Sequence, residues 1–373
     1  MSRVRLGVLF GGRSTEHEVS ILSARSIIGA IDSGRFEVIP LYIDKNGRWL
    51  VGESLERLLE GETARQYVYL PPDPTQRALV PAADDIKQTP GLPPLDVIFP
   101  VFHGLNGEDG TIQGVLELAN IPYVGSGVLG SALGLDKIYM KRAFAAVGLP
   151  VVEYVATTRR RFENDPLTFV GEVESRFGYP CFAKFANSGS SVGTSKAHNR
   201  EELLNGLRLA AGFDRKLLVE RGIDARELEV SVLGNDEPDA SVVGEVVPAR
   251  EFYDYEAKYL DEGSRLVIPA EIPADVSEQI RRMAIQAFES VDAAGMARVD
   301  FFLERTTNRV YINEVNTIPG FTRISMYPKL WEASGLPYRR LLERLIDLAI
   351  ERFRDKQRSQ TAIDSRLLRE AEA

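Results

Sequence analysis

The stretch that most constrains this fold lies late in the chain, at residues 298–325. Two segments there, 299–303 and 310–315, are rich in the β-branched and aromatic residues that strands favour. The short polar segment 305–309 between them predicts a turn. We therefore expect a β-hairpin centred on Thr307.

Such a hairpin has a definite pairing of polar side chains. Centred on Thr307, it places Asp300 opposite Glu314. It also places Arg298 opposite Asn316, and all four side chains then project from one face because strand residues alternate. Two carboxylates opposed across a ladder repel each other. The face therefore predicts either a divalent-cation site, for which Mg2+ suits oxygen ligands, or a charged surface in which Arg298 balances Asp300.

Composition narrows the class of protein. A chain of 373 residues with 44% hydrophobic and 27% charged residues is typical of a globular protein of two or three domains. The net charge of −9 argues against a nucleic-acid or anionic-membrane surface as main partner. The one cysteine, Cys181, forms no internal disulfide and is predicted to be a packed structural thiol. No segment has the pattern of a signal peptide or membrane helix, so we expect a cytoplasmic protein.

The first third of the chain has the pattern of an open α/β domain. Strands are expected at 5–10, 36–43 and 96–102, and helices are expected after residue 18 and at 111–119. Residues 52–94 are proline-rich and predicted to be an irregular surface insertion with one short helix at 54–61. Glu16 and His103 follow the first and third of these strands, at the sheet edge where such domains bind ligands.

The remainder predicts mixed helices and strands. Helices are expected at 136–147, 166–177, 201–211, 275–293 and 341–353, with strands at 151–157, 181–185, 216–223, 227–233 and 242–248. The last two strands and the hairpin predict an antiparallel sheet. Lys184 lies in an apolar strand directly before the glycine- and serine-rich segment 186–193, so it needs an anionic partner. Lys137 either contacts a phosphate or is a solvated helix charge.

Segment 252–259 alternates aromatic and charged residues. It predicts a mobile lid that carries Lys258 over a pocket, or alternatively a tyrosine-rich strand edge.

Several motifs, in this order, resemble those of the D-alanine:D-alanine ligase family of the ATP-grasp superfamily. The resemblance extends from Gly11 to about Gly335. It rests on G-G-R-S-T-E-H-E-V-S, H-G-x-x-G-E-D-G, L-D-K, K-F-A-N-S-G-S-S-V-G, F-Y-D-Y-E-A-K-Y, R-V-D and N-E-V-N-T-I-P-G-F-T-x-I-S-M-Y-P. Each motif alone is weak, whereas together and in sequence they are highly specific.

The resemblance implies a fold class, α/β and α+β. It is an ATP-grasp fold with an N-terminal open α/β (pre-ATP-grasp) domain and nucleotide held between two α+β domains. The implied boundaries are 1–125 for the N-terminal substrate domain with its insertion near 52–94, 126–220 for the central subdomain and 221–356 for the C-terminal subdomain. Residues 357–373 are expected to be a frayed tail.

It also implies which residues hold ATP and metal. Asp300, Glu314 and Asn316 match the ligands of two Mg2+ ions, with Mn2+ as a substitute and K+ as a monovalent cation. Matches to ATP-binding positions comprise Lys137 and Lys184 at the phosphates, Ser191 in the loop that closes over them, Glu220, Arg221 and Ile223 around the base, and Glu227 at the ribose.

Substrate and catalytic positions follow from the same resemblance. Glu16 matches the carboxylate that holds the first D-alanine ammonium, linked to Ser190 and Tyr259 in closing the site. His103 falls near that first subsite, and Lys258 belongs to the lid. The remaining matches are Arg298 and the Gly320 N–H at the oxyanion hole, with Ser325 and Met326 at the second D-alanine carboxylate.

The implied reaction is ATP-dependent ligation of two D-alanines through an acyl phosphate, for peptidoglycan precursor synthesis, by a cytoplasmic homodimer. Two alternatives stay open: a ligase that takes D-serine or D-lactate second, and a catalytically silent nucleotide-binding module. The lid pattern Tyr255, Lys258 and Tyr259 fits the dipeptide-forming type. Asn187-Ser188 and Arg323 depart from relatives and are expected to bear on loop closure and the second subsite.

Overall fold

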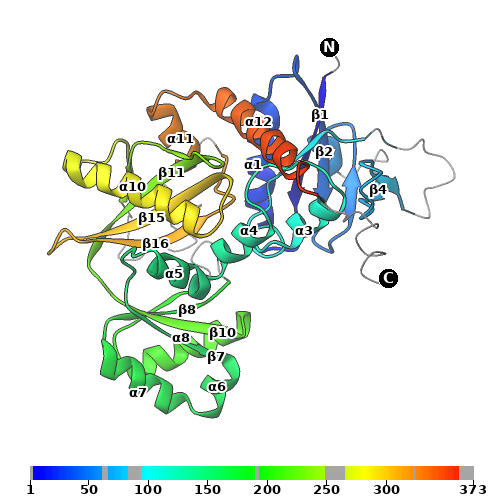
Figure 1. The fold of residues 1–373 in the computed structure, drawn as a ribbon. Helices are drawn as coiled ribbons and strands as arrows, with labels where there is room; N and C mark the ends of the chain where they lie inside the picture. The colour runs from blue at the N-terminus through cyan, green and yellow to red at the C-terminus, as the bar shows by residue number, and fades with distance from the viewer. Residues whose placement is uncertain are drawn as a thin grey trace, which may run out of the picture.

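The computed structural model describes residues 3–60, 66–82, 92, 94–187, 189, 193–247, 265–322 and 324–360. Within these ranges the strands form three sheets, ordered β5-β4-β3-β2-β1-β6, β7-β10-β8-β9 and β14-β13-β11-β15-β16, with β12 paired to β11. The three sheets and their helices lie side by side, with α4 and α5 near the middle of the molecule (Figure 1). The mixed α/β architecture predicted from sequence is confirmed.

The first sheet is mixed. Its strands are β1 (Val4–Gly11), β2 (Phe36–Ile43), β3 (Trp49–Val51), β4 (Gln66–Tyr69), β5 (Val80–Pro81) and β6 (Val97–Pro100), with helices α1 (His17–Ala30), α2 (Leu55–Glu60) and α3 (Thr111–Leu118). Strand β1 pairs in parallel with β2 and β6, as the alternation of strands and helices predicts. The carboxyl ends of β1 and β6 therefore lie side by side and bring Glu16 and His103 to one edge.

The prediction that 52–94 is an irregular insertion was wrong for its described part. The short helix is present as α2, but β4 and β5 extend the first sheet by antiparallel pairing onto β3. Val68, Leu70 and Leu79 are buried against this sheet. Strands of two to four residues between prolines give too little alternation to be seen in sequence. Residues 61–65, 83–91 and 93 lie outside the described residues.

The central unit has an antiparallel sheet with helices on it. Its elements are α4 (Val128–Leu135), α5 (Lys137–Ala146), β7 (Tyr154–Thr158), α6 (Arg159–Asn164), α7 (Pro166–Arg176), β8 (Cys181–Phe185), β9 (Ser195–Ala197), α8 (Arg200–Phe213) and β10 (Lys216–Arg221). Cys181 is buried among apolar residues of β8, β10 and the helices, as predicted. The sequence analysis missed α4 and α6, which are short.

The third sheet is antiparallel, as expected. It comprises β11 (Ala225–Gly234), β12 (Asp239–Ala240), β13 (Gly244–Val247), β14 (Arg265–Val267), β15 (Gly295–Glu304) and β16 (Val310–Asn316), covered by α10 (Ala274–Ser290) and followed by α11 (Met326–Ala333) and α12 (Tyr338–Lys356). The predicted segment 252–259 lies outside the described residues, as does the tail beyond residue 360.

The predicted hairpin is formed by β15 and β16. Asp300 pairs with Glu314 and Arg298 with Asn316, as the sequence predicts. Beyond Asp300 the register shifts by one, so that Phe301 pairs with Ile312. This irregularity is a β-bulge, in which one strand carries an extra residue. The pairing expected from a turn centred on Thr307 therefore holds for residues 298–300 with 314–316. Nearer the turn, the pairing is displaced by one residue.

Helix α12 packs on the N-terminal sheet as well as on the elements next to it in the chain. Leu341, Leu345 and Ile346 share one apolar cluster with Leu6 and Val8 of β1. Figure 1 shows α12 alongside α1. Residues far apart in the sequence thus complete one core.

We predict that Leu345→Ala destabilises the folded protein by about 2–5 kcal/mol, since it leaves a cavity in that shared core. Leu345 is fully buried, whereas Leu118 on α3 is exposed and supplies the control Leu118→Ala. Urea unfolding followed by circular dichroism measures both. Equal stability of the two variants would contradict the packing of α12 described here.

We also predict that Cys181 resists thiol reagents in the folded protein. Burial raises the pKa of its thiol to about 12. The thiolate is the reactive form, so at pH 8 the folded protein should react far more slowly than the protein unfolded in guanidinium chloride. A colorimetric disulfide-exchange assay follows both rates, and fast modification of the native protein would be inconsistent with a packed thiol.

Candidate active site

The polar face of the hairpin is a compact group of hydrogen-bonded charges. Arg298 donates from Nε to Oδ1 of Asp300 and from Nη2 to Oδ2, each over 2.7 Å. Asn316 donates from Nδ2 to the same Oδ2 over 3.0 Å. Arg298 Nε also lies 2.9 Å from Oε2 of Glu229 on β11. Burial alone would lower the pKa of Arg298, but Asp300 and Glu229 outweigh it and raise the pKa.

Glu314 is paired with a residue from outside the hairpin, at the start of helix α5. Its Oε2 lies 2.5 Å from Nζ of Lys137, the first residue of α5. The helix is fixed at that end because Asp136 accepts hydrogen bonds from the N–H groups of Ile138 and Tyr139, each over 3.1 Å. Asp136 also forms an ion pair with Lys216 of β10. The start of α5 therefore connects the central sheet to the hairpin.

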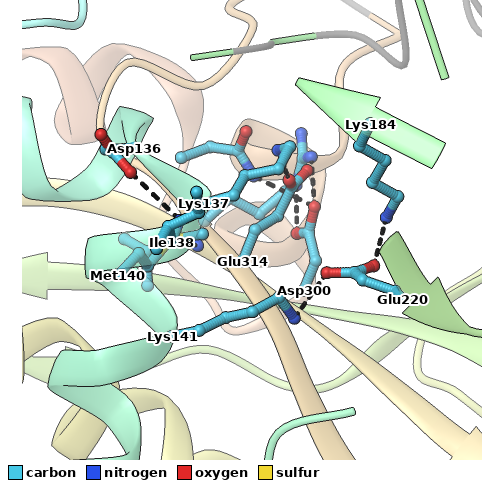
Figure 2. A network of polar contacts seen from close by, with 12 residues as sticks. Asp136, Lys137, Ile138, Met140, Lys141, Lys184, Glu220, Asp300 and Glu314 are labelled. Atoms are coloured by element: carbon cyan, nitrogen blue, oxygen red, sulfur yellow. Dashed lines mark hydrogen bonds and ion pairs between the residues drawn. The ribbon is translucent and has the colours of Figure 1, made fainter. Parts of the chain in front are cut away.

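A second buried group of charges surrounds Glu220 on β10. Its Oε2 accepts from Nζ of Lys184 over 2.6 Å, and its Oε1 lies 2.8 Å from Nζ of Lys141 on α5. Figure 2 shows Glu220 between the two lysines, close to the pair formed by Lys137 and Glu314. The anionic partner that sequence requires for Lys184 is Glu220.

Burial and charge act in opposite directions on these side chains. Burial alone would raise the pKa of Glu220, but Lys141 and Lys184 outweigh it, and the pKa falls well below its usual value. For Lys184, burial would lower the pKa, and Glu220 outweighs it, so the pKa rises. For Lys141, burial prevails over Glu220 and lowers the pKa. Glu220 therefore stays ionised across the range in which enzymes work.

The oxygens of the hairpin face suit a magnesium site. Asp300 and Glu314 pair across the ladder and do not face apart. Among the described residues no group of three or more His, Cys, Asp and Glu side chains is gathered for a metal. Two carboxylates with one carboxamide are nevertheless the donors that suit Mg2+, which completes its shell with water and phosphate oxygens. Arg298 balances Asp300, as the alternative interpretation expected, but both side chains are buried, so the face is not a charged surface.

Gly189, from the glycine- and serine-rich segment, lies next to the same face. It lines a small pocket together with Glu314, Asn316 and Lys137. A larger pocket of about 530 Å³, which Gly189 also lines, lies between residues 12–16 and 104–105 of the N-terminal unit and residues 185, 187, 213 and 214 of the central unit. Gly189 is therefore close to two of the predicted metal ligands, Glu314 and Asn316.

Glu16 lies between two glycines of different units. A Cβ added to Gly104 would come within 2.8 Å of Oε2 of Glu16, and one added to Gly189 within 2.9 Å. Gly104 also has a φ of 74°, which disfavours any side chain. Glu16 is buried at the larger pocket, where the sequence places a substrate ammonium.

His103 is buried and joins two loops. Its Nδ1 lies 3.0 Å from the carbonyl oxygen of Ile318, and its Nε2 lies 3.3 Å from Oγ of Ser23. A carbonyl can only accept, so Nδ1 carries the proton and Nε2 accepts from Ser23. The ring thus holds the loop after β16 against α1. The carbonyl group that His103 contacts is 215 residues away in the chain.

Glu108 has a similar position in the same loop. Its carboxylate accepts from the N–H of Gly104 over 2.7 Å and from the N–H of Ile318 over 3.2 Å. Burial, followed by the nearby Glu16, raises the pKa of Glu108 to about 8. Asp109 instead accepts from the N–H groups of Asn106 and Thr111, within the turn that leads into α3. Glu108 therefore connects its loop to Ile318, whereas Asp109 stabilises the turn before the helix.

The turn after β16 ends at the start of α11. Gly320 is packed against Ser325, since a Cβ on Gly320 would lie 2.8 Å from Oγ of Ser325. That hydroxyl accepts from the N–H of Thr322 over 3.0 Å. Ser325 is the N-cap residue of α11 and Met326 its first residue. The Met326 side chain is buried against Val246 and Leu330, so only its backbone faces the helix end.

The four residues expected around adenosine lie where the central sheet passes into the third sheet. Glu220 and Arg221 end β10, Ile223 is in the connection, and Glu227 is in β11 opposite Val246. The Arg221 N–H donates to the carbonyl of Glu153 over 2.9 Å. The carboxylate of Glu220 is engaged by Lys141 and Lys184. Ser190, Ser191, Lys258 and Tyr259 lie outside the described residues, as does Arg323.

Sequence reasoning missed two residues of these groups. Lys141 lies four residues after Lys137, on the same helix face as the buried Phe144, and a lysine on an apolar face signals a buried anion. Glu229 faces Asp300 across β11 and β15, and no local pattern indicates that pairing.

Comparison with known proteins agrees with the motifs. Residues 5–126 match the family model described as D-ala D-ala ligase N-terminus, and residues 143–347 match D-ala D-ala ligase C-terminus. A protein named D-alanine--D-alanine ligase from Heliobacterium modesticaldum is 53% identical over 363 residues, covering 97% of this chain and 98% of that protein. One of the same name from Thermoanaerobacter pseudethanolicus is 50% identical over 362 residues, covering 96% and 99%.

Solved structures give the same result. The D-alanine-D-alanine ligase from Coxiella burnetii superposes with a TM-score of 0.84 at 35% identity, covering 96% of this chain and 97% of that one. The VanG D-Ala:D-Ser ligase from Enterococcus faecalis superposes with a TM-score of 0.83 at 33% identity, covering 93% and 100%. With both family models matched in order and full-length relatives at about half identity, the chain belongs to the D-alanine–D-alanine ligase family.

Proposed function

We propose that this protein joins two D-alanine molecules, with ATP converted to ADP and phosphate, to supply D-alanyl-D-alanine for peptidoglycan precursors. The observation that carries the proposal is the group of carboxylates and cations on the hairpin face, next to Gly189. A site for nucleotide triphosphate needs both anions that hold metal and cations that hold phosphate. Membership of the family supports the reaction itself.

The cations have distinct roles in this proposal. Lys137 and Lys184 hold the ATP phosphates, helped by Ser191 of the loop. Both lysines are paired with carboxylates, at 2.5 Å and 2.6 Å. The pair of Lys137 lines the small pocket with Gly189, and the pair of Lys184 lies close to it (Figure 2). Residues 220–227 hold the adenosine, with Glu220, Arg221 and Ile223 around the base and Glu227 at the ribose.

Asp300, Glu314 and Asn316 would hold magnesium, as two ions, with Mn2+ as a substitute and K+ as a further cation. Bound there, Mg2+ would neutralise charge on the phosphates during transfer. The residues fit because their oxygens share one half-buried face of β15 and β16. Arg298 and Lys137, which balance these carboxylates here, would then be available to substrate.

The amino-acid steps use Glu16 at the larger pocket, together with residues of the hairpin and of the turn that follows it. Glu16 binds the ammonium of the first D-alanine, with His103 holding the adjoining loop. The carboxylate of that D-alanine attacks the γ-phosphate of ATP, which gives an acyl phosphate and releases ADP. The second amine then attacks the acyl carbon. Arg298 and the Gly320 N–H donate to the developing oxyanion, and phosphate leaves.

The second carboxylate binds at Ser325 and the backbone of Met326, because the N-terminus of α11 favours anions. Ser190, Tyr259 and Lys258 close the site against water, which would hydrolyse the intermediate.

Several further statements belong to the same proposal. The chain divides into units 1–125, 126–220 and 221–356, although α12 packs on the first of these. It acts as a homodimer in the cytoplasm, the compartment that supplies ATP, without nucleic acid or membrane as partner. No helix among the described residues is long and apolar enough to cross a membrane.

A second candidate function is D-alanine:D-serine ligation. One of the solved structures similar to this chain is a D-Ala:D-Ser ligase. D-Lactate is a further acceptor to test, and a silent nucleotide-binding module is the alternative without catalysis.

Phosphate and ADP release measured with D-alanine alone, and then with D-serine, D-lactate or L-amino acids as acceptor, tests the function. We expect turnover with D-alanine alone, with no gain from D-lactate. Turnover that requires D-serine would instead establish the second candidate. Absence of release with every acceptor, in protein that binds ATP, would indicate the silent module.

We predict that Glu314→Gln lowers turnover by roughly 100-fold or more, the scale for single groups that stabilise transferred charge. The substitution keeps the shape of the side chain but removes its charge. Glu304→Gln, at the tip of the same hairpin, is the matched control and should retain activity. Thermal unfolding confirms that both variants fold, and substantial activity of Glu314→Gln would contradict the metal assignment.

A further inference from the structure

Lys141 is the buried cation to which the proposed reaction gives no role. It lies on α5 one turn after Lys137, and residues four apart share a helix face. Lys137 points to Glu314 of the hairpin, whereas Lys141 points to Glu220 of the central sheet (Figure 2). Neighbouring lysines of one helix thus serve carboxylates of two different sheets.

Glu220 is shared between two cations. Its Oε1 lies 2.8 Å from Nζ of Lys141, and its Oε2 lies 2.6 Å from Nζ of Lys184. Lys184 and Glu220 lie on the same sheet face, because Lys184 pairs with Leu218 and Glu220 is two residues further along β10. Two lysines facing one carboxylate leave an excess of positive charge, which suits an incoming anion.

The three side chains differ in their access to a ligand. The exposed fraction is 1% for Lys141, 4% for Glu220 and 14% for Lys184. Nζ of Lys141 also lies 5.8 Å from the ring centre of Tyr154. A ligand can therefore approach Lys184 but not Lys141.

This difference matters once Lys184 contacts a phosphate. The lysine must then give up some or all of its contact with Glu220, which would leave a buried carboxylate without a partner if no second cation were present. An uncompensated buried charge is strongly destabilising. Lys141 remains beside Glu220 whichever partner Lys184 has.

We propose that Lys141 is a positioning residue for nucleotide binding, which keeps Glu220 compensated while Lys184 exchanges that carboxylate for the phosphates of ATP. This inference rests on the proposed function, because it takes ATP as the ligand of Lys184. Lys141 touches neither nucleotide nor substrate. Its effect is on the phosphates alone, not on the adenosine moiety.

Binding of ATP and of adenosine, each measured by isothermal titration calorimetry, tests the proposal in Lys141→Met. We expect the affinity for ATP to fall on the order of 100-fold, because the phosphates must now compete with Glu220 for Lys184. The affinity for adenosine should be unchanged. If Lys141 had a purely structural role, the substitution would weaken the binding of ATP and of adenosine to the same extent.

Two further variants separate these roles. Adding Glu220→Gln to Lys141→Met removes the competing carboxylate, so the ratio of ATP to adenosine affinity should return toward that of the original protein. Arg200→Met breaks an ion pair of the same central unit, with Glu174, that involves neither helix α5 nor Glu220. It should lower the melting temperature and leave the ratio unchanged.

The outcomes distinguish the two proposals. If the unaltered protein binds neither ligand, the proposed function and this inference both fail. If it binds both and Lys141→Met keeps the original affinity ratio, only this inference is overturned.

Should Lys141→Met not fold, the double variant is compared with Glu220→Gln alone. It carries no charge at the two most buried positions, 141 and 220, and Lys184 keeps 14% of its side chain exposed to water, so it should fold. We expect equal ATP affinities, and weaker ATP binding by the double variant would overturn the inference by showing that Lys141 acts on the ligand directly.

Discussion

The pairing of buried charges between elements of different sheets is the interaction on which the candidate site depends. Helix α5 supplies three of these pairs within a little more than one turn: Asp136 with Lys216, Lys137 with Glu314 and Lys141 with Glu220. Ions taken out of water are tolerated only when their partners are in place. The position of α5 therefore fixes the central sheet relative to the hairpin, and with it the distance between the phosphate-binding and metal-binding residues.

The N-terminal unit is held to the hairpin and its following turn by hydrogen bonds between side chains and the backbone. His103 and Glu108 both contact Ile318, one at its carbonyl oxygen and one at its N–H. Ile318 follows the hairpin directly. The loop after β6 and the turn after β16, which we propose face the first substrate and the oxyanion, thus share Ile318 as their common support. These contacts explain why a histidine and a glutamate are buried there.

The sequence was sufficient for the parts of the site that follow from local periodicity. The alternation of strand residues placed Asp300 opposite Glu314, because both lie within a few residues of one turn. The bulge beyond Asp300 was not foreseen, although Ile312 and Val315 of the apolar core are three residues apart rather than two and so break the alternation. Lys141 required knowledge of which strand its helix covers, and the partner of Arg298, Glu229, comes from a strand more than sixty residues away. Contacts of that range depend on sheet order, which local patterns do not specify.

Helix α12 shows how the order of synthesis differs from the order of assembly. The strands of the first sheet lie between residues 4 and 100, yet the cluster that covers β1 includes leucines between residues 341 and 348. During translation this sheet leaves the ribosome with part of its apolar surface open to solvent. That surface is covered only when the segment 338–356 has emerged and returned to it. The first unit to be made is therefore among the last to be finished, and its exposed face is where a nascent chain of this protein would need protection from aggregation.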